Sequence, residues 1–174
     1  GKLEVGEVYT LRELLFPYLI ESSNDAGVAI ERTWGETLTP IIRGIITTAG
    51  VDGQAMVADF NGLEAETAAS PEALATLLKH LEVTTPTVFD ITSLSQYVGL
   101  HPLVNNSPFI ADEHYRGGKH GYTPEAGKTA VLRLTHSFGD HERPLLLVIQ
   151  GSNNLPETKR QLLEQLDTAV ELVS

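Results

Sequence analysis

The sequence predicts an α+β fold in which a helical half precedes an antiparallel sheet and a C-terminal helix. Two observations predict this order. Apolar residues recur at helical spacing in the first half of the chain, whereas segments 130–137 and 144–150 are β-rich and flank a turn. With 174 residues, 41% of them hydrophobic, the chain can bury one sizeable core. We therefore expect a single domain, with a helical part over about 8–112 and the sheet and last helix over about 113–174.

The first helix is predicted to run from Thr10 to about Ile20. Thr10 and Glu13 have the spacing of a capping box, in which each side chain bonds the other residue's backbone amide. Apolar residues then recur on one helical face: Leu11, Leu14, Leu15, Tyr18 and Leu19. Pro17 falls inside this helix, so we expect a kink or a new turn there.

Three more helices are expected in the helical half. Residues 22–34 form a short helix that Gly35 ends, and residues 38–48 form another that Gly50 stops. The third covers residues 70–81, with a serine at its N-cap and a proline at its first helical position.

The remaining segments are loops and strands, followed by the last helix. Residues 57–67 are loop-like and contain the turn pair Asn61-Gly62, and a short strand is expected at 97–100. The two β-rich segments enclose residues 138–142 and predict a hairpin. The helix after Pro156 is amphipathic, with apolar residues at Leu162, Leu163, Leu166, Val170 and Val173.

The charge of the chain excludes one class of partner. Its formal net charge is −11 and its pI is about 4.9, so it lacks the basic footprint that nucleic-acid binding requires. Four cations nevertheless gather in one segment against the single acid Glu125: Arg116, Lys119, Lys128 and Arg133. This cluster either attracts an anionic ligand locally or is a chance feature of a strand pair.

Disulfides and thiol chemistry are excluded because the chain has no cysteine. It contains no signal peptide and no apolar run long enough to span a membrane. Because it begins with Gly1 rather than Met, we expect the natural protein to extend upstream, where any membrane tether or targeting segment would lie.

Residues 117–127 carry the strongest chemical signal, Gly-Gly-Lys-His-Gly-Tyr-Thr-Pro-Glu-Ala-Gly. Glycines in a strand let another backbone approach closely, so a ligand could lie along this edge beside Lys119. The structural alternative is a strand that ends in a glycine-rich turn with a solvated lysine. A second segment, Ser22-Ser23-Asn24, offers a hydroxyl and an amide two residues apart, although such residues also serve as helix caps.

Both segments resemble boxes of the serine-type D-alanyl-D-alanine carboxypeptidases, the low-molecular-weight penicillin-binding proteins of the β-lactamase and transpeptidase-like family. The family box reads Lys-Thr-Gly-Tyr-Thr-x-x-Ala-Gly, and only its first Thr is changed here, to His120. Ser22 to Ala26 matches the Ser-x-Asn box, and two further similar segments follow in family order, Asp59 to Leu63 and Val104 to Ser107.

The resemblance implies roles for six residues. Ser22 relays protons with a catalytic lysine, Asn24 holds the substrate backbone, and Lys119 supplies positive potential. Lys119 and His120 meet the substrate's terminal carboxylate, and Gly121 and Tyr122 are further substrate-binding residues. Because His120 replaces a hydroxyl, we hypothesise that ligand affinity rises below about pH 6.5, where imidazole gains a proton.

One family element is absent, the Ser-x-x-Lys that carries the nucleophile. Thr76-x-x-Lys79 is the nearest imitation, and it falls in the wrong order along the chain. The chain therefore resembles the C-terminal two thirds of a transpeptidase-like domain. We expect the 174-residue chain itself to be inactive without an upstream nucleophile, and whether the natural protein is an enzyme stays open. The sequence also lacks a Gly-x-Ser-x-Gly elbow, and its histidine pairs lack metal-ligand spacing, so we expect neither a metal nor another cofactor.

The resemblance implies a peptidoglycan stem peptide or a β-lactam as ligand, and a location outside the cytoplasmic membrane of a bacterium. The alternative is a non-catalytic relative that binds peptidoglycan or a partner protein. Without a central helix, apolar surface on Leu14 and Leu15 should be exposed, which makes self-association an expectation as well.

Overall fold

The computed structural model describes residues 2–170 and begins its regular structure with helix α1 (Leu11–Ile20). The predicted capping box is present: Glu13 N donates to Thr10 Oγ1 at 3.2 Å, and Thr10 N donates to Glu13 Oε2 at 2.7 Å. The helix continues unbroken through Pro17. Local sequence signals therefore predicted this element and both of its ends.

Helix α2 (Asn24–Thr48) is a single element of 25 residues, so the prediction of two short helices was wrong. Gly35 does not end the helix, and Pro40 also lies within it. A glycine inside a helix costs only about 1 kcal/mol relative to alanine. Packing offsets that cost, because Ile30 belongs to a cluster with α1 while Ile46 belongs to a cluster with α3.

A loop joins strands β1 (Ala55–Met56) and β2 (Ala68–Ala69), which pair antiparallel. The predicted turn lies in this loop, and Gly62 has a φ of 69°, which favours glycine. Helix α3 (Pro71–Thr84) then starts as predicted, with Ala73 N donating to the N-cap Ser70 Oγ at 3.1 Å.

Helix α4 (Thr87–Ser93) was not predicted. Its seven residues include several β-branched side chains and have no side-chain cap, so they carry little helical signal. The expected short strand at 97–100 is β3 (Gln96–Val98), which pairs with β4 (Pro102–Val104).

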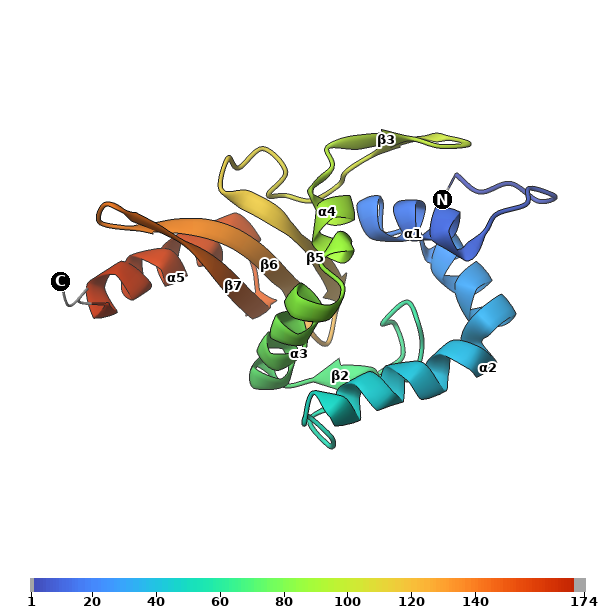
Figure 1. The fold of residues 1–174 in the computed structure, drawn as a ribbon, viewed down its shortest axis with the longest axis horizontal. Coiled ribbons are helices and arrows are strands. Elements are labelled where there is room, and N and C mark those ends of the chain that lie inside the picture. Colours follow the sequence, from blue (N-terminus) through green and yellow to red (C-terminus); the bar gives the residue numbers. More distant parts are fainter. Residues whose placement is uncertain (1, 171–174) are drawn as a thin grey trace.

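The main sheet has the order β5-β6-β7 and is antiparallel, as predicted. It consists of β5 (Tyr115–Thr123), β6 (Gly127–Phe138) and β7 (His141–Ser152), and the last two form the predicted hairpin. Helix α5 (Leu155–Ala169) packs along this sheet (Figure 1). Val173, placed in the last helix from the sequence, lies outside the described residues.

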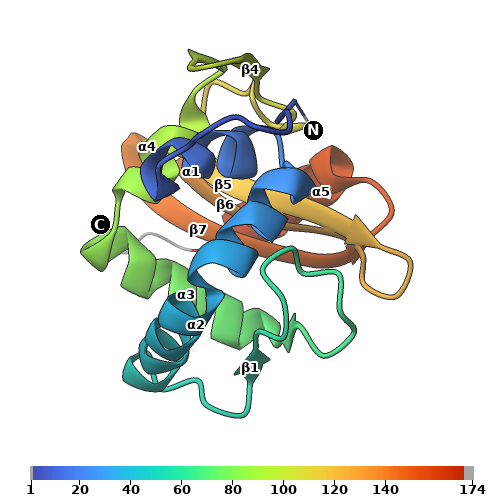
Figure 2. The same ribbon diagram turned by 90° about the vertical axis from the view of Figure 1, so that its right-hand side faces the viewer.

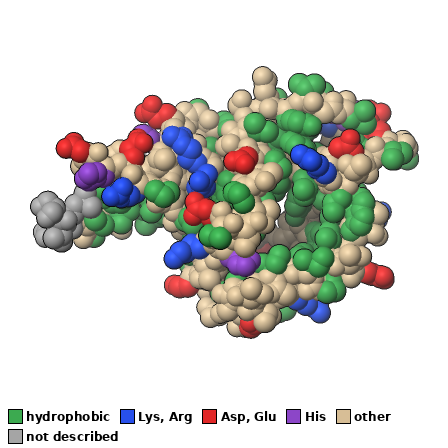
Figure 3. All heavy atoms as spheres, viewed as in Figure 1, with side chains coloured by type: hydrophobic (Ala, Val, Ile, Leu, Met, Phe, Trp, Pro, Cys, Tyr) green, Lys and Arg blue, Asp and Glu red, His purple; other side chains and the backbone are tan. Residues whose placement is uncertain are grey.

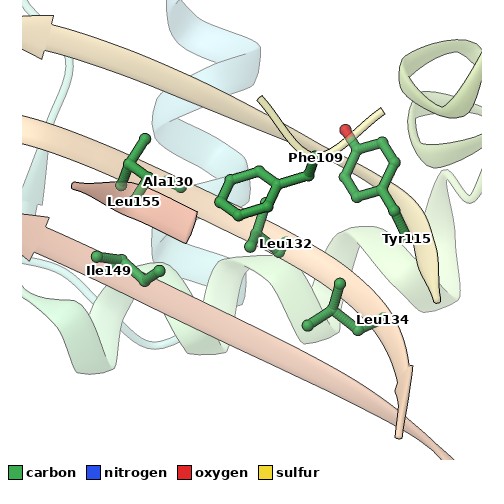
Figure 4. Packing of buried hydrophobic residues seen from close by; sticks show 7 residues of the cluster. All are labelled: Phe109, Tyr115, Ala130, Leu132, Leu134, Ile149 and Leu155. Carbon is green, nitrogen blue, oxygen red and sulfur yellow. The ribbon is translucent and has the colours of Figure 1, made fainter. Parts of the chain in front are cut away.

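The largest core cluster lies between the sheet and α5 (Figure 4). Alternate residues of β6 point into it, as the period of a strand requires. The buried members are Phe109, Tyr115, Ala130, Leu132, Leu134, Ile149 and Leu155. This cluster fixes the sheet as the rigid wall against which the rest of the chain is built.

The sheet and α5 form one side of the molecule, and α1 and α2 form the other, with α3 and α4 between them (Figures 1 and 2). Leu14 is only 3% exposed, because it packs with Ala26 and Ile30, so the expectation that it lies open was wrong. Among residues 2–170, no helix is long and apolar enough to cross a membrane.

Candidate functional site

A cavity of about 1500 Å³ lies between the two sides of the molecule, and Figure 3 shows it as a hollow bordered by apolar side chains. It is enclosed by α1, α2, the loop between β1 and β2, α3 and β5. Its apolar lining includes Leu11, Leu15, Tyr18, Leu38, Ile41, Ile42, Ile45 and Leu63. Leu15 lines the cavity but is half-buried against the same cluster as Leu14, so the expected exposed surface at Leu15 is present only in part.

Polar residues from two distant parts of the chain line the same cavity. All six residues that the sequence singled out are among them: Ser22, Asn24, Lys119, His120, Gly121 and Tyr122. The first two come from the α1–α2 junction and the other four from strand β5. The structure brings these residues together, and the chemical roles given to them stay predictions.

Ser22 has an unusual backbone conformation. Its φ of 55° is the single positive φ of a non-glycine residue in the described chain, and such conformations cost about 1–3 kcal/mol. Two neighbours hold it: Asn106 Nδ2 donates to the carbonyl of Glu21 at 2.7 Å, and Ser23 N donates to the carbonyl of Pro17 at 3.1 Å. Strain of this kind gathers at functional sites, where surrounding contacts impose it.

Lys119 reaches across the cavity end to this serine. Its Nζ donates a hydrogen bond to Ser22 Oγ and another to the carbonyl of His120 at 2.9 Å. Burial lowers the pKa of Lys119 from 10.5 to about 8, because the ammonium form is poorly solvated there. Lys119 is therefore mostly a cation at pH 7. It loses its proton at a pH only slightly higher, near its pKa of about 8.

The pKa of His120 is also lowered from 6.5, first by burial and second by the neighbouring charge of Lys119. The imidazole is therefore neutral at pH 7, and the positive charge of the site resides on the lysine. We still expect the ligand to bind more tightly when His120 is protonated. Because the pKa of His120 is lowered, this protonation occurs below pH 6.5 in the free protein.

Gly117 and Gly118 do not make room for a ligand, although the sequence predicted that they would. They allow the strand to pack closely against its neighbours. A Cβ on Gly117 would lie 2.4 Å from the carbonyl oxygen of Phe89, and one on Gly118 would lie 2.3 Å from that of Val131. These glycines let β5 pack against α4 and β6. Gly121 differs, since a Cβ there would approach nothing closer than Thr129 Oγ1 at 3.6 Å. Of the three glycines, it is the one that leaves room beside the cavity.

A buried threonine of α4, which the sequence did not indicate, holds the start of β5. Thr92 is 2% exposed, and its Oγ1 accepts a hydrogen bond from Gly118 N at 2.9 Å while donating to the carbonyl of Val88 at 2.9 Å. Asn105 Nδ2 donates to the carbonyls of Thr92 and Leu94, both at 2.8 Å. These bonds set the position of the strand segment that carries Lys119.

Other candidate chemistry does not converge on the cavity. Thr76 and Lys79 are both exposed on α3, and the Thr76 hydroxyl donates to the carbonyl of Glu72. His136 is bonded to Asp167 at 2.6 Å, and His101 is bonded to Glu7 at 2.6 Å. Across residues 2–170, no three His, Cys, Asp or Glu side chains gather in a way that could hold a metal ion.

Comparison with known proteins gives matches through structure alone. No protein-family model and no curated protein sequence matches the chain. A penicillin-binding protein of Listeria monocytogenes in its cefotaxime-bound form superposes with a TM-score of 0.77 at 18% identity, covering 92% of this chain and 67% of that one.

Two other solved structures give the same result. A D-alanyl-D-alanine carboxypeptidase of Mycobacterium tuberculosis has a TM-score of 0.74 at 20% identity, with 99% of this chain and 72% of that one covered. A mutant of a Streptomyces DD-transpeptidase has a TM-score of 0.80 at 16% identity, with 97% and 72% covered. The chain has the fold of these proteins over nearly its whole length and spans only part of theirs, and at such low identity the likeness establishes the fold alone.

Proposed function

Because the chain has the fold of the penicillin-binding proteins, we propose that it is the greater part of a serine-type D-Ala-D-Ala carboxypeptidase-like domain. The domain would act on peptidoglycan stem peptides outside the cytoplasmic membrane of a bacterium. The observation that carries this proposal is the hydrogen bond from Lys119 to Ser22 at the polar end of a large apolar cavity that Asn24 also lines.

The residues present support acyl transfer but do not complete it. A serine hydroxyl from an upstream segment would attack the carbonyl carbon of the penultimate D-Ala, and the peptide C–N bond would break. Ser22 would pass a proton to the departing amine, and water would later hydrolyse the serine ester. Asn24 would hold the substrate backbone, and the Lys119 cation with His120, Gly121 and Tyr122 would bind the terminal carboxylate.

The cavity also suggests where the upstream segment would sit. Ligand pockets measure roughly 300–1000 Å³, and this cavity of about 1500 Å³ exceeds that range. Its apolar lining suits a helix with an apolar face better than a peptide ligand alone. In this proposal, residues 2–170 form one truncated domain, and a helix bearing Ser-x-x-Lys fills the apolar end.

Intact-mass analysis after incubation with benzylpenicillin tests the proposal. We expect a covalent adduct on the chain extended to its native start and none on the 174-residue chain. No adduct on either form would contradict the carboxypeptidase proposal.

The second candidate is a non-catalytic relative that binds peptidoglycan or a partner protein. It is favoured by His120, which stands where the family has a hydroxyl. A Ser-x-x-Lys in the upstream coding sequence separates the two candidates, because the enzyme requires it and the binding protein does not.

A further inference from the structure

The loop between β1 and β2 is held in one shape by Asp59. Its carboxylate accepts hydrogen bonds from Thr67 Oγ1 at 2.6 Å and from Leu63 N at 2.9 Å. Burial raises the pKa of Asp59, but these hydrogen bonds to its charged form outweigh burial and leave the pKa below 3.8. The loop is therefore preorganised rather than a loose connection.

The same loop is attached to the two helices that frame the polar end of the cavity. The Tyr18 hydroxyl of α1 donates to the carbonyl of Phe60, and Phe60 N lies 3.5 Å from Glu31 Oε2 of α2. The next residue, Asn61, lines the cavity together with Ser22 and Asn24. Nothing in the proposed function so far uses this side chain.

Asn61 is seated against Gly27 of α2. A Cβ built on Gly27 would lie 1.8 Å from Asn61 Oδ1 and 2.9 Å from Asn61 Cγ, so the amide occupies space that any other residue at 27 would fill. Asn61 Oδ1 is buried and accepts no hydrogen bond from residues 2–170. A buried amide oxygen without a partner is costly, and in native structures such atoms call for an explanation.

The orientation of the amide decides what it can bind. Because the oxygen is buried against Gly27, the NH₂ group is the end of the amide left to meet a ligand in the cavity that Asn61 lines. An amide NH₂ binds hydrogen-bond acceptors such as the carbonyl oxygen of a peptide or a β-lactam.

We propose that Asn61 is a further ligand-binding residue, whose amide donates a hydrogen bond to a backbone carbonyl of a peptide-like ligand in the cavity, and that Gly27 is required to seat it. This inference rests on the proposed function, because that function supplies the ligand class. It adds a third wall to the site, from a loop distant in sequence from both boxes.

The test measures binding of an N-acetylated peptide ending in D-Ala-D-Ala to the 174-residue chain. Binding is observed through the side-chain amide NMR signals of the chain. We expect the Asn61 NH₂ signals to shift on titration. Loss of one neutral hydrogen bond corresponds to about 5-fold weaker binding, and we expect that loss in Asn61→Ala. Gly27→Ala should weaken binding similarly, because its new methyl group displaces the amide. The exposed Asn153 lies outside the cavity lining, so Asn153→Ala is the matched control.

The outcomes separate this inference from the proposed function. If the wild-type chain binds the peptide and both variants bind it equally well, the role of Asn61 is wrong and the proposed function stands. If the wild-type chain shows no binding, the role of Asn61 fails, whereas the proposed function is decided separately by the benzylpenicillin adduct on the extended chain.

A double-mutant cycle of thermal stability tests the packing of the Asn61 amide against Gly27 without any ligand. Gly27→Ala should lower the thermal midpoint clearly in the wild-type background and much less in the Asn61→Ala background, where the two nearest atoms are gone and only Tyr18 Cε2, at 3.1 Å, stays close. Equal losses in both backgrounds would overturn the packing on which the inference depends.

Discussion

Lys119 donates a hydrogen bond to Ser22 although 97 positions separate them in the chain. The bond joins the edge strand of the sheet to the junction of the first two helices. Each partner is held in an unfavourable state, since the lysine is desolvated and the serine has a positive φ. Such a pair reduces stability, and we expect replacements at both positions to stabilise the fold while removing function.

Lys119→Met should make the chain more stable at pH 7 by about 1–3 kcal/mol, because one pKa unit corresponds to about 1.4 kcal/mol and the charged form is the one that burial penalises. The folded pKa of about 8 lies below the usual 10.5, so between these values the unfolded wild type binds more protons. Wild-type stability should therefore rise from pH 8 toward 10.5 relative to the variant. Urea unfolding across this range measures the difference, and the exposed Lys128→Met is the control.

Ser22→Gly should be more stable than Ser22→Ala by about 1 kcal/mol, because both lose the hydroxyl but only glycine adopts a positive φ without strain. Thermal unfolding of the two variants side by side measures this gap. If they melt at the same temperature, the backbone of residue 22 is not strained. Ser23, which caps α2 through Ala26 N at 3.3 Å, offers a comparison where serine is favourable.

Ligand affinity should rise as the pH falls below 6.5, and it should fall between pH 7 and 8 as Lys119, with a pKa of about 8, begins to lose its proton. The folded pKa of His120 is depressed, so protonation in the free chain costs stability, and a ligand carboxylate reverses that preference by pairing with the imidazolium. Calorimetric titration with a D-Ala-D-Ala peptide from pH 5 to 8 provides the profile. A His120→Thr variant with the same profile as the wild type would sink the hypothesis.

Gly117→Ala should destabilise the chain by about 2–4 kcal/mol, because its Cβ would lie 2.4 Å from a backbone oxygen and its φ is 114°. Gly121→Ala is the matched control on the same strand and should change stability by less than about 1 kcal/mol. Denaturant midpoints of the two variants decide the matter, and a tolerated alanine at 117 would show that β5 and α4 can separate.

Elements with local signals were predictable from the sequence. The capping box of α1 and the Ser-Pro start of α3 lie within a few residues of the ends they define. The length of α2 was not predictable, because Gly35 and Pro40 argue locally for breaks and only packing at both ends overrides them. Helix α4 was not predicted because burial, rather than the helix propensity of its residues, makes it helical.

The site divides in the same way. Ser22 and Lys119 were found through resemblance to known boxes, and periodicity would not have paired them. Thr92, Asn106 and Asn61 act through contacts with distant backbone or with a glycine across the cavity. Thr92 carries no sequence signal. Asn61 and Asn106 lie in the two segments Asp59 to Leu63 and Val104 to Ser107 that resemble the family, but the resemblance gives neither side chain a role, so the structure was needed to identify their contacts.

Helix α2 has a mechanical consequence for the cavity that it borders. It is fully buried at Ile30 and again at Ile46, and no residue between these two is buried. Between them, Trp34, Leu38 and Ile42 are only half-buried against the two clusters, so the central turns are packed less firmly than the ends and are less protected against local opening. We expect bending of the middle of α2 to change the width of the cavity for an incoming segment. The opposite wall, formed by the sheet, stays rigid.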